Sequence, residues 1–421
     1  MPKPVHRWRS EPGCNNRLRL ILVTGGDEVV RLAAQGDGLT QSGRHVPHTV
    51  PGDVLEQDGS ISAGPHRAVP PCRHFGTCGG CRLQHADEEV LRQFIMDRVL
   101  LAAAGQGAVP ETVLPTHMSP PRTRRRAVLH AQLIGKRALL GYREAASHRI
   151  VDMRECHVLH PDLFALVQPL RDFLREHAGR SPIDLSLTVA DHDVDCLVKG
   201  LVIDSYTGHE DLLALAKAHN LSRLSLDQGW GAETIWEPEP VTISLAGFPV
   251  PLPAGAFLQA TADGEAALQA DVTRFCHAEG LVADLFAGLG TLSLPLAAEG
   301  RRVVLVEADR AAHLASRHAL TRFGGNSQAL HRDLFRAPLN GAELSRFTTV
   351  ILDPPRAGAK AQVEELASSE VARIVYVSCN PASWARDAAK LIAGGYRLEA
   401  VRPIGQFRWS THVELSSVFT R

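Results

Sequence analysis

Cys379 stands at the end of an apolar run, RIVYVSC, and polar residues follow it. Side chains at the carboxyl ends of parallel strands face the crevice where ligands bind, so a thiol at this position is available for chemistry. A lone cysteine is commonly a buried structural thiol, but such a thiol would more often lie in the middle of a strand. The position therefore favours a nucleophile at Cys379, with a structural thiol as the alternative.

A second loop of this kind, LDPPRAG, extends from Leu352 to Gly358. It places Asp353 at the end of another apolar run, and Pro354 and Pro355 fix the path of the backbone as it leaves the sheet. We expect this rigid loop to hold substrate beside Cys379.

A glycine-containing loop predicts a nucleoside site. The run LVADLF continues into AGLGTLSLPLA, where Gly288 and Gly290 let the backbone approach a ligand. Glu307 ends the next apolar run, where a carboxylate can accept hydrogen bonds from both ribose hydroxyls. A dinucleotide site would need a third glycine near Leu292 or Ser293, and neither is glycine. We therefore expect S-adenosylmethionine rather than a nicotinamide cofactor. The carboxylates expected around it are Asp284, Asp333 and Asp353.

A group of cysteines predicts a metal centre. Cys72, Cys78 and Cys81 lie within ten residues, and Cys156, in the polar segment DMRECHV, is the best candidate for a fourth ligand. Four thiolates suit either zinc or an iron-sulfur cluster. Zinc sites usually have two close pairs of cysteines, so this spacing favours a 4Fe-4S cluster, with chance clustering as the alternative. The other cysteines stand alone and are assigned no role: Cys14, Cys196 and Cys276.

The elements that must position these residues fall into three regions. Residues 1–66 contain short apolar alternations punctuated by glycine turns, which predict a small β-barrel similar to TRAM or OB barrels, or a β-domain without an RNA role. Residues 67–254 predict a mixed α+β domain, in which a helical insert at about 86–106 is a candidate to pack on the catalytic domain. Residues 255–421 alternate apolar runs with helical segments, which predicts an α/β, doubly wound parallel sheet.

Composition narrows the location and the partners. The chain has 421 residues and a formal net charge of -1, so attraction to a nucleic acid must come from local patches such as Arg122 and Arg124 to Arg126. The basic start lacks an apolar core behind it, and the longest apolar stretch, 281–297, is interrupted by charge and glycine. We expect a cytoplasmic protein with no membrane span and no obligate protein partner.

Taken together, these motifs resemble the uracil-5 RNA methyltransferases, and in particular their iron-sulfur branch acting on large-subunit ribosomal RNA. The resemblance covers nearly the whole chain. It rests on the cysteine spacing completed by Cys156 and on a series of motifs in the same order. These are FLQ at 257–259, DLFAGLGT, Glu307, DPPRAG, VSCNP, and STHVE ending at Glu414.

The resemblance implies a seven-stranded, Rossmann-like methyltransferase domain and assigns roles by position. Cys379 becomes the nucleophile and Glu414 the base. Two differences concern single contacts: the family often has asparagine where Thr261 and Thr291 stand, and an aspartate where Gly405 stands. The methyl-donor contacts implied are Gln259, Phe286, Glu307 and Asp353, with Asp333 near the adenine.

The chemistry explains why these groups are required. Addition of the Cys379 thiolate to carbon 6 of a uracil, flipped out of the RNA, makes carbon 5 nucleophilic enough to take the methyl group. A base then removes the carbon 5 proton, and elimination frees the enzyme. The substrate expected is ribosomal RNA. The alternatives are transfer RNA, a different methyl acceptor, or a non-catalytic RNA-binding protein that keeps a vestigial donor site. The arginines expected on phosphates are Arg122 to Arg126, Arg143, Arg149 and Arg154.

Overall fold

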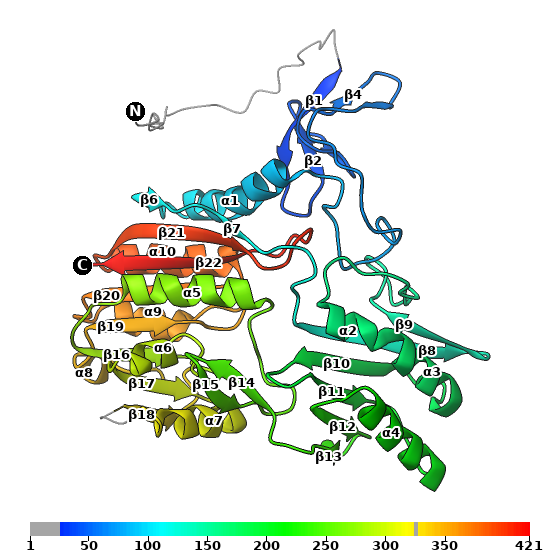
Figure 1. Ribbon diagram of the computed structural model, residues 1–421. Coiled ribbons are helices and arrows are strands. Elements are labelled where there is room, and N and C mark those ends of the chain that lie inside the picture. Colours follow the sequence, from blue (N-terminus) through cyan, green and yellow to red (C-terminus); the bar gives the residue numbers. More distant parts are fainter. Residues whose placement is uncertain (1–25, 324–326) are drawn as a thin grey trace.

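The computed structural model describes residues 26–323 and 327–421 (Figure 1). The first region is an antiparallel sheet in the order β3-β2-β1-β4-β5. Its strands are β1 (Asp27–Leu32), β2 (Gly38–Thr40), β3 (His45–Val46), β4 (Val54–Leu55) and β5 (Ile61–Ser62). Within the described chain β3 and β5 remain open edges rather than closing the predicted barrel, because each is only two residues long. The first of the apolar alternations within residues 1–66, LRLILV (18–23), lies outside the described residues.

Helix α1 (Glu88–Gly105) joins this sheet to the rest of the molecule. The Asp87 side chain caps it by accepting a hydrogen bond from the backbone N–H of Val90. Phe94 and Ile95 are buried in one core with residues of the C-terminal region, and the helix packs against α10 (Pro381–Ala393) and β21 (Arg397–Gly405). The α1 segment therefore covers one side of the large C-terminal sheet.

The middle region is built on a six-stranded sheet in the order β13-β12-β11-β10-β8-β9. Only the β11–β12 pair is parallel. Helix α4 (Tyr206–Ala218) makes that crossover, and α2 (Pro161–Ala165) and α3 (Val167–His177) pack with it on the sheet. The strands are β8 (Arg126–Ile134), β9 (Arg137–Gly141), β10 (Ile183–Val189), β11 (Val194–Lys199), β12 (Arg223–Asp227) and β13 (Ala232–Trp236). A hairpin, β14 (Thr242–Leu245) and β15 (Phe248–Pro251), leads to the last region.

Seven strands from residues 255–421 form the predicted doubly wound sheet, in the order β18-β17-β16-β19-β20-β22-β21. They are β16 (Leu281–Leu285), β17 (Arg302–Glu307), β18 (Gln328–His331), β19 (Thr349–Leu352), β20 (Arg373–Ser378), β21 and β22 (Glu414–Thr420). The order reverses between β16 and β19, which is where such sheets bind ligands. Two further short strands, β6 (Thr112–Val113) and β7 (His117–Met118), pair with β21, so the complete sheet has nine strands.

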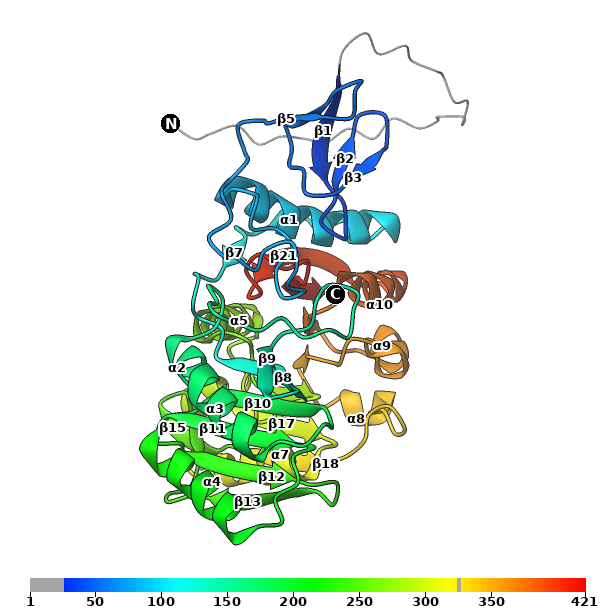
Figure 2. The same ribbon diagram turned by 90° about the vertical axis from the view of Figure 1, so that its right-hand side faces the viewer.

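The apolar strand sequences are explained by helices on both faces of this sheet. Val282 and Ile351 pack with α5 (Ala262–Phe275), α6 (Leu294–Ala298) and α7 (Arg310–Leu320). Ala283 and Leu352, which point to the opposite face, pack with α1, α8 (Gly341–Leu344), α9 (Lys360–Ala367) and α10. Figure 2 shows the resulting stack of layers from the N-terminal sheet through α1 to the large C-terminal sheet.

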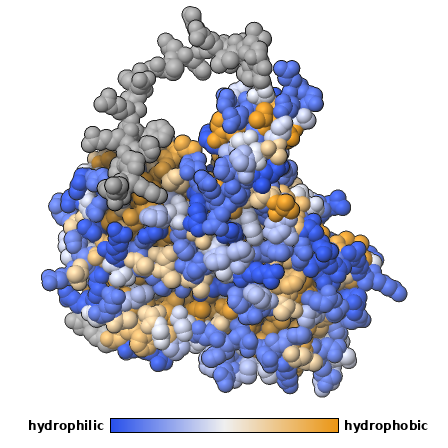
Figure 3. Space-filling view, turned by 45° about the horizontal axis from the view of Figure 1, so that its top comes forward, coloured by the Kyte–Doolittle hydropathy of each residue, from blue (hydrophilic) through white to orange (hydrophobic). Residues whose placement is uncertain are grey.

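On the face of the described residues that is seen in Figure 3, hydrophilic residues cover most of the surface, and the hydrophobic residues are scattered in patches. Among the helices of residues 26–323 and 327–421, none is long and apolar enough to cross a membrane.

Candidate active site

The structure brings Cys379 and Glu414 together through strand register. β20 pairs antiparallel with β22, and Ser378 lies opposite Leu415. Continuing this register by one residue places Glu414 opposite Cys379. Asn380, the next residue, caps α10 by accepting a hydrogen bond from the backbone N–H of Ala382. The thiol therefore lies at the end of a strand and beside the start of a helix, where the helix dipole favours negative charge.

Opposing charges act on the Cys379 thiol. Burial raises its pKa, and the carboxylates of Glu414 and Asp353 raise it further. Arg356 lowers the pKa by its charge and by a hydrogen bond to the sulfur. A nitrogen of Arg356 also lies 2.9 Å from Nδ1 of His412. Arg356 could not be singled out from the sequence, although it stands within the DPPRAG motif, because only the folded loop shows that its side chain reaches the thiol.

The two carboxyl groups beside Cys379 resist ionisation. Burial raises the pKa of Glu414 to about 7, although the charges of Arg126 and Arg356 and a hydrogen bond from Gln406 lower it. Burial also raises the pKa of Asp353 well above its usual range, and the charges of Glu414 and Asp284 add to this effect. A carboxyl group with a pKa near neutrality can exchange protons under ordinary conditions, as a general base requires.

The predicted donor loop follows β16 and is hydrogen-bonded to Glu307, the last residue of β17. The carboxylate of Glu307 accepts hydrogen bonds from the backbone N–H groups of Gly288, at 2.8 Å, and Asp309, at 2.6 Å. Phe286 has a φ of 62°, an unusual value for a non-glycine residue and one typical of strained ligand-binding loops. A Cβ atom at Gly290 would lie 2.8 Å from Cδ2 of Leu305, so glycine lets this loop pack directly on β17.

The other predicted carboxylates lie around the same loop. Asp284 is fully buried and accepts a hydrogen bond from the Ser293 hydroxyl at 2.5 Å, and burial raises its pKa to about 7. Asp333 accepts from the backbone N–H of Phe335 at 2.9 Å. The ring of Phe335 lies 5.3 Å from that of Phe286, centroid to centroid, and is half exposed. An aromatic pair next to Asp333, with Phe335 exposed and Phe286 partly buried, suits an adenine ring, and Phe335 was missed because no sequence motif marks it.

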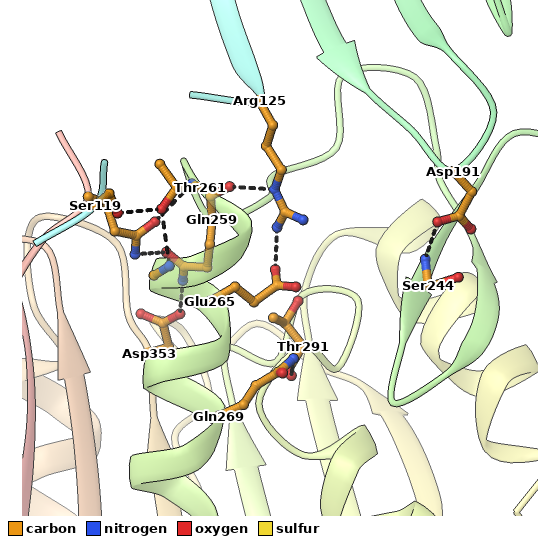
Figure 4. A network of polar contacts seen from close by, with 12 residues as sticks. Ser119, Arg125, Asp191, Ser244, Gln259, Thr261, Glu265, Gln269, Thr291 and Asp353 are labelled. Atoms are coloured by element: carbon orange, nitrogen blue, oxygen red, sulfur yellow. Dashed lines mark hydrogen bonds and ion pairs between the residues drawn. The ribbon is translucent and has the colours of Figure 1, made fainter. Parts of the chain in front are cut away.

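Gln259 contacts Asp353, as drawn in Figure 4, and is linked to Glu414 through Gln406. Its side-chain nitrogen lies 3.4 Å from Oδ2 of Asp353, and its side-chain oxygen accepts a hydrogen bond from Nε2 of Gln406 at 2.9 Å. Gln406 also donates to Glu414. Gln406 could not be identified from the sequence. A glutamine carries no charge, and Gln406 belongs to none of the motifs that marked the other site residues.

The differences from the family pattern have local causes. Thr261 caps α5 by accepting a hydrogen bond from the backbone N–H of Gly264 at 3.2 Å. A Cβ atom at Gly405 would lie 2.4 Å from Cδ1 of Ile95, so a larger residue there would displace the end of the Ile95 side chain of α1. The backbone carbonyl of Thr291 accepts from Gln269 at 2.9 Å, as drawn in Figure 4. These positions stabilise the surroundings of the site.

The arginine patch is divided between two roles. Arg125 is buried, forms an ion pair with Glu265 of α5 and donates a hydrogen bond to the backbone carbonyl of Gln259 at 3.1 Å (Figure 4). Its expected contact with RNA phosphate is therefore wrong, because the guanidinium joins the middle region to the catalytic domain. Arg126 stacks over the Phe257 ring at 4.4 Å. Arg122 is exposed.

The four predicted metal ligands, Cys72, Cys78, Cys81 and Cys156, line one cavity. The loop that carries the first three is docked on the middle region: Gly79 donates its backbone N–H to the carbonyl of Arg143 at 2.9 Å. Burial raises the pKa of Cys81 to about 12, and charges on the other three thiols would raise it further. The four thiols are therefore close neighbours. Cys14 lies outside the described residues.

These cysteines are not arranged around a single ion. Within the described ranges, no group of three or more histidine, cysteine or acidic side chains is placed to hold one metal ion. A four-iron cube binds each thiolate at a different corner, so its ligands surround a cavity rather than one point. The four thiols line a common cavity, and the 4Fe-4S cluster stays a prediction. Cys196 and Cys276 are buried elsewhere, as expected for structural thiols.

Comparison with known proteins places this site in a family. Residues 255–421 match the family described as tRNA (Uracil-5-)-methyltransferase. An uncharacterized RNA methyltransferase of Zymomonas mobilis is 46% identical over 395 residues, which cover 94% of this chain and 99% of the relative. A 23S rRNA (uracil(1939)-C(5))-methyltransferase of Nitrosococcus oceani is 33% identical over 391 residues, covering 87% of this chain and 85% of the relative.

A solved structure has the same fold. The Pyrococcus abyssi tRNA (uracil-54, C5)-methyltransferase in complex with S-adenosyl-L-homocysteine superposes with a TM-score of 0.75 at 21% identity, covering 94% of this chain and all of that chain. The fold, the donor loop and the extended sequence matches agree, and the chain belongs to the S-adenosylmethionine-dependent uracil-5 RNA methyltransferases.

Proposed function

We propose that the protein methylates carbon 5 of a uridine in 23S ribosomal RNA through a covalent bond between Cys379 and carbon 6. The observation that carries this proposal is the pairing of β20 with β22, which sets Glu414 opposite Cys379. Cys379 adds to carbon 6, carbon 5 attacks the methyl group of the sulfonium, and Glu414 accepts the carbon 5 proton. The electron pair of that carbon–hydrogen bond then forms the carbon 5–carbon 6 double bond as the sulfur leaves.

The donor is assigned to the loop after β16. Glu307 would bind the ribose hydroxyls, Phe286 and Asp333 the adenine end, and Asp353 with Gln259 the end next to the reacting carbon. The two backbone N–H groups on Glu307 hold its carboxylate in place for this role. The exposed Phe335 ring, beside Phe286, is available to stack on the adenine.

Ribosomal RNA is favoured over transfer RNA by the activity of the Nitrosococcus relative, whose alignment covers 87% of this chain at 33% identity. The rival substrate is transfer RNA, on which the Pyrococcus enzyme acts, but that enzyme shares the fold at low identity. The exposed arginines of the middle region, Arg122, Arg143 and Arg149, supply positive charge for the RNA backbone in either case.

The cysteine-lined cavity is assigned to a 4Fe-4S cluster held by Cys72, Cys78, Cys81 and Cys156. When bound, such a cluster supplies a covalent cross-link between distant segments and no step of the methyl transfer. The cysteines join the loop at 72–81 to residues near Cys156, beside the exposed arginines. We expect Cys81→Ser to lose iron and sulfide and to bind RNA more weakly. Cys276→Ser should keep its iron and sulfide and bind RNA normally. A variant that keeps its iron would contradict the assignment.

The experiment that tests the function uses RNA carrying 5-fluorouridine, which cannot lose a proton from carbon 5 after methylation. Protein, S-adenosylmethionine and either 23S ribosomal or transfer RNA are incubated, and mass spectrometry locates any covalent adduct. We expect a methylated adduct on Cys379 with the ribosomal RNA. An adduct with transfer RNA alone would move the substrate to transfer RNA. No adduct with either RNA, despite bound donor, would support a vestigial site that only binds RNA.

A further inference from the structure

Gln406 occupies a fully enclosed position between the donor side of the site and the base. It follows the last residue of β21 and is 1% exposed. The first turn of α5 is shaped around it: a Cβ atom at Gly264 would lie 2.4 Å from Cγ of Gln406. The absence of a side chain at Gly264 therefore leaves the room that the Gln406 side chain occupies.

The hydrogen bonds fix which end of the Gln406 amide is oxygen. Its Oε1 lies 3.2 Å from the backbone nitrogen of Thr261, which can only donate. Nε2 must therefore face the other way, and there it donates to Oε1 of Gln259 and to Oε2 of Glu414. Both protons of this nitrogen are used, so the amide cannot be reversed without losing three hydrogen bonds.

The orientation of the Gln406 amide also determines how its hydrogen-bond partners Gln259 and Glu414 are oriented. Because Oε1 of Gln259 accepts from Gln406, the nitrogen of Gln259 is directed at Asp353, 3.4 Å away. On the other side, Oε2 of Glu414 is held by a donor that cannot accept a proton. The two oxygens of Glu414 are thereby made unequal, and Oε1 is the one without this donor.

We propose that Gln406 is a positioning residue for proton removal, which occupies Oε2 of Glu414 so that the proton from carbon 5 is delivered to Oε1. This inference rests on the proposed function. The carbon 5–hydrogen bond breaks, its proton goes to Oε1, and its electrons form the carbon 5–carbon 6 double bond. The carbon 6–sulfur bond breaks at the same time, and its electrons return to Cys379 as thiolate.

Other charges also act on Glu414 and must be kept constant in a test. Arg126 of β8 and Arg356, after β19, lower its pKa, whereas Asp353 and Cys379 are acidic groups that face it. The hydrogen bond from Gln406 lowers the pKa as well, and burial outweighs all three lowering effects. Removal of the Gln406 amide should therefore raise the pKa of Glu414 and shift proton removal to higher pH.

The test compares Gln406→Met with Gln362→Met. Gln362 is equally buried, but its amide bonds only to the backbone of Leu339, away from the site. Methyl transfer is followed with labelled S-adenosylmethionine, and proton removal with RNA tritiated at carbon 5 of the target uridine. For Gln406→Met we expect proton release to slow by about tenfold or more, the effect of one lost hydrogen bond to a charged group. Methylated RNA should then accumulate on Cys379.

A second variant guards against a loss of folding. Gln406→Glu keeps the volume but places a carboxyl group on Glu414, so the pH at which proton release is half-maximal should rise further than in Gln406→Met. Equal slowing of methyl transfer and proton release, with no adduct and an unchanged pH profile, would reduce Gln406 to a structural role and overturn the inference. If the wild-type protein neither releases tritium nor forms an adduct, the proposed function itself fails, and this inference fails with it.

Discussion

Glu414 lies opposite Cys379 because β22 enters the sheet antiparallel to β20, with Leu415 paired to Ser378. The two residues are 35 positions apart in the chain, yet adjacent strands place them side by side. A charge on Glu414 raises the pKa of the Cys379 thiol. The proposed nucleophile and the proposed base, which must both lose protons, therefore lie on adjacent strands.

The pH dependence of turnover should follow from this pair. The pKa of Glu414 is about 7 and that of Cys379 is raised, so both groups are protonated at low pH and turnover on natural uridine should rise as pH increases through about 7. Adduct formation with 5-fluorouridine needs the thiolate but no proton removal, so its profile should lack the contribution of Glu414 as a base and keep only the effect of the Glu414 charge on the thiol. Measuring both rates between pH 6 and 9 would separate the two groups. Identical profiles would show that Glu414 is not the base.

Arg356 should set the reactivity of the nucleophile. Its charge and hydrogen bond are what lower the pKa of Cys379, so Arg356→Met should slow alkylation of this thiol by iodoacetamide near neutral pH and shift the alkylation profile upward. Lys360→Met removes an exposed positive charge four residues further along and serves as the control. If both variants alkylate like the wild type, Arg356 does not stabilise the thiolate.

Glu307 should determine affinity for the methyl donor. Replacement by Gln leaves an amide that can donate as well as accept, next to the backbone N–H groups of Gly288 and Asp309. We expect about a tenfold to hundredfold loss of S-adenosylmethionine affinity by calorimetry, as for a lost hydrogen bond to a charged group. Glu299→Gln, at an exposed carboxylate after α6, should bind normally. Unchanged affinity in Glu307→Gln would remove this residue from the donor site.

The strands that carry the chemistry were predictable from sequence because both of their faces are buried. The predicted runs LVADLF and RIVYVSC, and those ending at Glu307 and Asp353, coincide with β16, β20, β17 and β19. The participation of β6 and β7 in the same sheet was missed, since each has only two residues and pairs with β21 nearly three hundred residues later. Two-residue strands have no periodicity from which pairing can be read.

The residues of the site likewise fall into those that could be predicted from the sequence and those that could not. Cys379 and Glu307 end apolar strands and could be found from position, whereas Glu414 was identified only by resemblance. Arg356 and Gln406 could not be identified, because their roles depend on side-chain directions within loops. Arg125 was misread since its neighbours in sequence are also basic, and only the fold shows that Glu265 meets it. Local sequence reports charge, but not which charges are already paired.

Gly290 should be sensitive to a single methyl group. Both Gly290 and Gly300 have positive φ values, 83° and 82°, so alanine is strained by the backbone at either position. Of these two, only Gly290 would bring its Cβ atom against neighbours, at 2.8 Å from Leu305 and 2.9 Å from Leu294. Gly290→Ala should therefore lower the free energy of unfolding by about 1–3 kcal/mol more than Gly300→Ala, measured by denaturant titration. Equal losses would mean that the loop can shift to make room for the methyl group without lowering the free energy of unfolding further.

Arg125 and Arg122 should separate stability from RNA binding. Arg125→Met leaves the buried Glu265 without its partner, which typically costs about 3–5 kcal/mol of stability, and the double variant Arg125→Met/Glu265→Met should recover part of this loss. Arg122→Met removes an exposed charge, so it should leave unfolding unchanged and reduce the salt dependence of RNA binding by about one phosphate contact. Arg125→Met should not reduce that salt dependence, provided that RNA binding is measured where the variant is folded. A reduced slope in Arg125→Met with unaltered stability would instead place Arg125 on the RNA, and the buried ion pair could not then be what joins the middle region to the catalytic domain.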